Sequence, residues 1–189
     1  MIRIALIIGI VGGALWISLA FFPPACVPVT AANEVFCNRL WTPALAAMCV
    51  GFGGLLLSGR PSATRGVRWS LSALVIGSAA MVGGNFGEYW LAYALPHQGP
   101  DGFVRGLLWM SVLVGLLTVL VASAVAGVLM SRSMPGLRWP SLLFVLPLSS
   151  TILVALVSPS WIGTPLGMLG ILAGVFGLTA GRRQAELGL

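Results

Sequence analysis

The sequence predicts an all-α membrane protein, a single domain over residues 1–189 in which six transmembrane helices are joined by short loops. Hydrophobic residues make up 58% of the chain and charged residues 7%, whereas soluble domains carry about 25% charged residues. A hydrocarbon core of about 30 Å needs about 20 helical residues to cross it. Barrel strands are about 10 residues long and alternate in polarity, so continuous apolar runs favour helices. Six such runs lie at about 4–22, 40–57, 69–93, 103–130, 139–157 and 161–180.

The first run follows Arg3 and ends before a pair of prolines. It extends over about 19 residues, longer than the usual 7–15 of the apolar region of a signal peptide. We therefore expect it to remain in the protein as the first span.

The segment 23–39 is the expected first outer loop, and it contains Cys26 and Cys37. Prolines at 23, 24 and 28 give it no strong helical pattern. In an oxidising compartment two cysteines 11 positions apart can form a disulfide, which would stabilise the fold by about 2–3 kcal/mol. These cysteines with His97 and Asp101 match no compact zinc pattern, so neither a metal site nor another cofactor is predicted.

The third run, 69–93, contains Glu88, the only acid inside an apolar run. Asn85 precedes it by three positions and therefore shares its helix face. About 30 Å of helix separate Glu88 from the basic residue at the start of the run, which places Glu88 near the outer boundary of the membrane. There it can pair with Arg105 or with Arg39, and an ionisable residue in a span is also a candidate for ligand or proton binding.

The fourth run begins close to Arg105, and the fifth run, 139–157, contains Pro147 followed by Ser149, Ser150 and Thr151. Proline removes a backbone donor and tends to kink a helix, and hydroxyl groups can satisfy the freed carbonyls. The same three hydroxyls are the second candidate for a ligand site, because they lie near the middle of the membrane.

The last run carries glycines at spacings of 4, 3, 4, 3 and 4, which places them on one face of a helix. Helices in a bilayer associate by close packing of such small residues. This face is expected to pack inside the bundle or to form a homodimer; its members are Gly163, Gly167, Gly170, Gly174, Gly177 and Gly181.

Charge predicts the orientation. All ten basic residues are arginine, and eight of them lie at the chain ends or in alternate loops, with Arg39 and Arg105 in the other set. Basic residues near span ends stay on the cytoplasmic side, so both termini are expected in the cytoplasm of a cell (plasma or inner) membrane.

No catalytic motif is present, neither Gly-x-Ser-x-Gly, His-Glu-x-x-His nor a phosphate-binding loop, and the arginines are too dispersed to predict nucleic-acid binding. We expect a non-catalytic accessory or assembly subunit that acts through the bilayer and a membrane-protein partner. The alternative is a small-solute-binding or transport component with an outward-facing site near Glu88.

Overall fold

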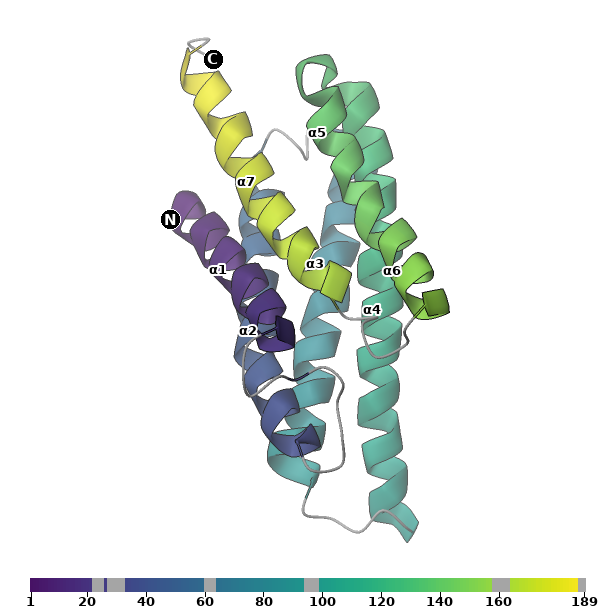
Figure 1. Cartoon of the computed structure of the whole chain (residues 1–189). Helices are drawn as coiled ribbons and strands as arrows, with labels where there is room; N and C mark the ends of the chain where they lie inside the picture. The colour runs from purple at the N-terminus through teal and green to yellow at the C-terminus, as the bar shows by residue number, and fades with distance from the viewer. Residues whose placement is uncertain (22–25, 27–32, 60–63, 94–98, 158–163, 187–189) are drawn as a thin grey trace.

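The computed structural model describes residues 1–21, 26, 33–59, 64–93, 99–157 and 164–186, and within these residues every regular element is a helix (Figure 1). The long helices run alternately up and down, and both chain ends lie in the upper half of the view. The described residues contain no strand, which agrees with the predicted all-α class. In chain order the helices are α1 (Ile2–Phe21), α2 (Glu34–Leu57), α3 (Arg65–Phe86), the π-helix η1 (Gly87–Ala92), α4 (Gly99–Ser133), the 3-10 turn η2 (Pro135–Leu137), α5 (Arg138–Leu142), the 3-10 turn η3 (Leu143–Val145), α6 (Leu146–Val157) and α7 (Thr164–Glu186).

Among the described residues, four helical segments are long and apolar enough to cross a membrane: Ile2–Leu19, Glu34–Leu57, Arg65–Ala92 and Gly102–Ser133. The apolar part of α7, Pro165–Gly181, is shorter. These four segments make the chain compatible with a membrane protein.

The fifth predicted run is helical without a gap from Arg138 to Val157, but it is not α-helical throughout. It divides into α5, η3 and α6, and the N–H of Leu146 bonds to the carbonyl of Leu143 in a 3-10 turn. Pro147 lies in the first turn of α6, where a missing backbone donor costs little. The 3-10 turn changes the hydrogen-bond pattern inside this helical segment, which the hydropathy of the run does not reveal.

The start of α2 also differs from the expectation. The helix begins at Glu34, so part of the segment assigned to the outer loop is helical. A polar turn of helix outside an apolar run carries no hydropathy signal, and Glu34 in the first turn interacts favourably with the helix dipole.

Helix α1 packs antiparallel between α2 and α7 through glycines. A Cβ added at Gly9 would lie 2.6 Å from the Cα of Gly51, and one added at Gly167 would lie 2.8 Å from the carbonyl oxygen of Gly13. On α7, Gly170 faces Met48, while Gly174 and Gly177 face the side chain or backbone of Leu6. The predicted glycine face thus contacts α1 and α2 over these positions.

One described member of that face departs from the pattern, and another is not described. An added Cβ at Gly181 would meet no atom within 4 Å, and Gly163 lies outside the described residues. Helices α3 and α4 also approach each other through glycines, since a Cβ at Gly115 would lie 2.6 Å from the carbonyl oxygen of Gly77.

Candidate functional site at the junction of α2, η1 and α4

Polar side chains join the first half of α2 to the end of α3. The Thr42 hydroxyl donates to Oδ1 of Asn85 at 2.6 Å, and Nδ2 of Asn85 donates to Oδ1 of Asn38 at 3.2 Å. Trp90 completes the group by donating from Nε1 to the Thr42 hydroxyl at 3.3 Å. Asn85 is buried, and these bonds give its amide a structural role between two helices.

Directly after Asn85 the α-helix widens into the π-helix η1, which contains Glu88. Such turns are rare and often occur at functional sites. Gly87 begins it, and a Cβ there would lie 2.7 Å from Cδ2 of Leu108 on α4. The small residue therefore lets the widened turn lie close against α4.

Glu88 pairs with Arg105 across the contact between η1 and α4. Nη2 of Arg105 lies 3.8 Å from Oε1 of Glu88, and each side chain is 7% exposed. The guanidinium of Arg105 also lies over the Tyr93 ring, 5.1 Å from its centroid. Of the two arginines expected as possible partners of Glu88, Arg105 is the one that pairs with it in the structure.

Arg39 makes different contacts. Its Nε donates to the carbonyl of Tyr89 at 2.9 Å, and its guanidinium lies 5.4 Å from the centroid of the Trp90 ring. Oε1 of Glu34 accepts a hydrogen bond from the Tyr89 hydroxyl at 2.8 Å. Both residues of α2 therefore hold the π-helix in place.

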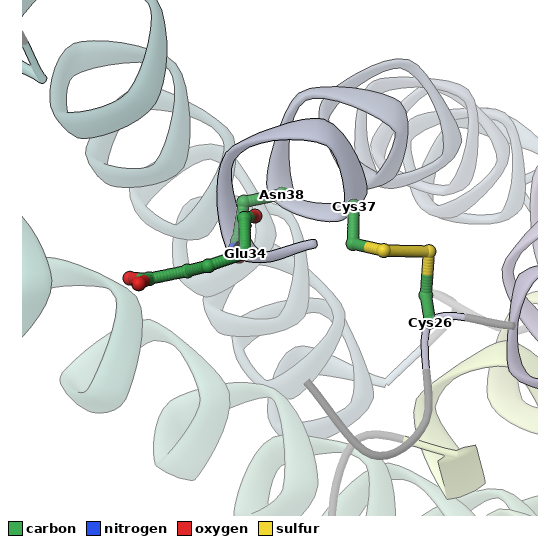
Figure 2. The surroundings of a disulfide bond; sticks show 4 residues. All are labelled: Cys26, Glu34, Cys37 and Asn38. Atoms are coloured by element: carbon green, nitrogen blue, oxygen red, sulfur yellow. Dashed lines mark hydrogen bonds between the residues drawn. A yellow bond between two sulfur atoms is a disulfide. The ribbon is translucent and has the colours of Figure 1, made fainter. Parts of the chain in front are cut away.

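The disulfide between Cys26 and Cys37 secures the first turns of α2, as Figure 2 shows. Their Cα atoms lie 5.5 Å apart, and the backbone N–H of Cys26 bonds to the carbonyl of Leu19 on α1 at 2.8 Å. The predicted pairing of these cysteines is thus present. Glu34 projects from α2 away from the disulfide, toward the neighbouring helices.

These elements enclose a pocket of about 280 Å³ lined by Glu34, Glu88, Gly102, Arg105, Gly106 and Trp109. Oε2 of Glu88 is buried and has no hydrogen-bond partner among the described residues. An unsatisfied carboxylate oxygen away from water is costly, since it loses its hydration without a replacement. Glu88 therefore contributes to the pocket wall a carboxyl group with one oxygen that has no partner among the described residues.

The hydroxyls of the other candidate site lie elsewhere. Ser149 donates to the carbonyl of Leu146 at 3.1 Å, and Ser150 donates to the same carbonyl at 2.6 Å, whereas the carbonyl that lacks its helical donor because of Pro147 is that of Leu143, which accepts from the N–H of Leu146. Thr151 is buried, and its Oγ1 has no partner among the described residues. None of the three lines the pocket around Glu88.

His97 lies outside the described residues, and so does the side chain of Asp101. The structure therefore does not describe how these two side chains lie relative to the two cysteines. The two cysteines are joined to each other by the disulfide.

Sequence reasoning did not place Glu34 or Trp109 in the site. Glu34 was assigned to a loop, although Glu34, Asn38 and Thr42 recur at intervals of four and so share one helix face. This row of polar residues could have indicated that the helix begins before residue 40. Trp109 lies inside an apolar run and gives no such signal.

Comparison with known proteins yields no match to a protein-family model, to a curated protein or to a solved structure.

Proposed function

We propose that this chain is a small-solute-binding membrane protein whose ligand occupies the pocket around Glu88. In this proposal the chain spans a cell membrane six times with both termini in the cytoplasm, and the pocket opens on the outer side. The observation that carries the proposal is Glu88, which lines a pocket of about 280 Å³ and whose buried Oε2 has no partner among the described residues. An ionisable residue inside a span is expensive and is commonly retained for function.

Two further features support a binding site here. The π-helix places Glu88 at a departure from regular helix geometry, and the surrounding polar groups are fixed by bonds from α2. A preorganised site loses less entropy when it binds a ligand. We do not assign catalysis, because neither the sequence nor the lining residues contain a nucleophile with an adjacent base.

A subunit that acts through a membrane partner is expected to expose a glycine or small-residue face that points away from its own bundle. On α7 the glycines at 167, 170, 174 and 177 pack within the chain. This observation favours solute binding over partner binding through that face.

Native mass spectrometry of the full chain, extracted with its own lipids, tests the proposal. We expect a bound small molecule on the wild type that is lost in Glu88→Gln, which removes the charge but keeps the shape. The matched control is Glu186→Gln, which removes the same charge at the last residue of α7 and should retain the molecule.

Two results would contradict solute binding at Glu88. One is a small molecule held equally by wild type and Glu88→Gln. The other is a stoichiometric second polypeptide with no small molecule, which would restore the accessory-subunit function.

A further inference from the structure

We infer that the ligand of this pocket presents a primary ammonium group, held between the carboxylates of Glu34 and Glu88. This inference rests on the proposed function and specifies the chemistry of its ligand. It is carried by three properties of the pocket: its charge, its unused acceptor and its size.

The charge of the lining favours a cation. Two carboxylates and one guanidinium face the pocket, which leaves one net negative charge when all three are ionised. The guanidinium of Arg105 is already directed to Glu88 and to the Tyr93 ring. Arg39 is not a lining residue and is held by Tyr89 and Trp90. An anion would therefore meet two repelling carboxylates.

The unused acceptor requires a donor. Glu88 is 6% exposed, and its Oε2 has no partner among the described residues. An ionised carboxylate only accepts hydrogen bonds, so it needs an N–H or O–H from the ligand. A primary ammonium group has three N–H donors and complements the charge, whereas a quaternary ammonium group has none.

The size and walls restrict the ligand to a small headgroup. The volume of 280 Å³ is slightly below the usual range of about 300–1,000 Å³ for sites that hold drug-sized ligands. Trp109 adds an aromatic wall, which can attract a cation through its ring face. A metal ion fits less well, since Ca²⁺ takes about 6–8 oxygen ligands and the lining side chains offer two carboxylates.

A primary ammonium group can come from a free amine or from an aminophospholipid headgroup. To separate these sources, we would place the full chain in nanodiscs of phosphatidylglycerol alone and measure binding of ethanolamine, choline and acetate at pH 7 by calorimetry. A second set of nanodiscs would contain phosphatidylethanolamine.

We expect ethanolamine to bind in phosphatidylglycerol nanodiscs. Choline should bind at least about 10-fold more weakly, because its quaternary ammonium group cannot donate the charge-assisted hydrogen bond, and acetate should bind at least as weakly because both carboxylates repel it. Glu88→Gln should lose ethanolamine binding, and Glu186→Gln should keep it. If the lipid headgroup is the native ligand, phosphatidylethanolamine will compete with ethanolamine; if it is a free amine, the affinity will not change.

A second variant keeps the charges and fills the space. Gly106 lines the pocket, and a Cβ added there would meet no atom within 4 Å, so the chain can accept a larger residue. Gly106→Leu should weaken ethanolamine binding while thermal stability without ligand is retained. Unchanged ethanolamine binding in Gly106→Leu would contradict binding in this pocket.

The ammonium inference is overturned if choline binds as tightly as ethanolamine, if acetate binds instead, or if neither ethanolamine nor phosphatidylethanolamine binds the wild type. In each of these cases a small molecule lost from Glu88→Gln in native mass spectrometry would still support solute binding. Failure of the ligand class and failure of the proposed function are thus distinguishable.

Discussion

At the scale of single residues, the site depends on how Glu88 divides its two oxygens. Oε1 lies 3.8 Å from Nη2 of Arg105, while Oε2 has no partner among the described residues. Burying a charge is costly and pairing offsets part of that cost, so each member of the pair needs the other. One carboxylate can therefore serve both the fold and the ligand.

A double-mutant cycle measures this dependence. Glu88→Ala and Arg105→Ala should each lower the free energy of unfolding, because each leaves the other charge buried without its partner. The double variant should lose less than the sum, with a coupling energy of about 0.5–3 kcal/mol. Unfolding in mixed detergent micelles supplies the values.

The control cycle combines Arg105→Ala with Glu186→Ala, in which no coupling is expected. Additive losses for Glu88 and Arg105 would show that the pair contributes no energy despite its geometry.

At the scale of helices, the apolar runs predicted where the long helices lie but not how each helix begins or breaks. The run 40–57 missed the polar first turns of α2, which supply Glu34 and Asn38. The run 139–157 predicted one helix, and the segment is helical throughout, but its apolar composition does not indicate the 3-10 turn at Leu143–Val145. Hydropathy reports transfer into lipid and is insensitive to both effects.

The close packing of α1 against α7 can be tested with two glycine substitutions on α7. A side chain at Gly174 would collide with Ile10 and would lie 2.6 Å from the carbonyl oxygen of Leu6, whereas Gly181 has open space. Gly174→Leu should therefore destabilise the fold by at least about 1–3 kcal/mol, the usual cost of overpacking.

Thermal melting and size-exclusion profiles in mild detergent report the change. Gly181→Leu is the matched control on the same helix and should behave like the wild type. Equal stability of Gly174→Leu and wild type would mean that α1 and α7 are not packed this closely.

At the scale of the whole molecule, the distribution of arginine predicts which end of the bundle faces the cytoplasm. The starts of α2 and α4 and the end of α3 lie together at the lower end of the view, which holds the disulfide and the pocket (Figure 1). The charge rule predicts that this end is the outer one. A disulfide is also expected on the oxidising side of a membrane.

Cysteine labelling in intact cells tests this orientation. In a Cys49→Ser background, a membrane-impermeant maleimide should label His97→Cys from outside. It should label Ser62→Cys only after the membrane is permeabilised, because that loop is predicted to be cytoplasmic. The opposite pattern would invert the topology and place the pocket in the cytoplasm.

The sequence identified the residues with unusual chemistry more readily than the site they form. Glu88 was singled out because charge is rare in an apolar run, and the cysteine pair because both lie in one short segment. To predict the pocket one must know which side of α2 carries Glu34, that Glu88 lies in a π-helix, and where Trp109 lies on α4. All three depend on contacts between distant segments. Such contacts leave no local pattern in a single sequence.

The meeting of Gly9 and Gly51 limits how this protein can vary. When a large residue touches a small one, a gain in volume on one side can be offset by a loss on the other. Here both partners are already the smallest residue, and a Cβ on either would lie within 2.5 to 2.6 Å of the other backbone. No compensating exchange exists, so in any set of descendants of this chain these two positions should stay glycine together, even where the rest of the helix surface drifts freely.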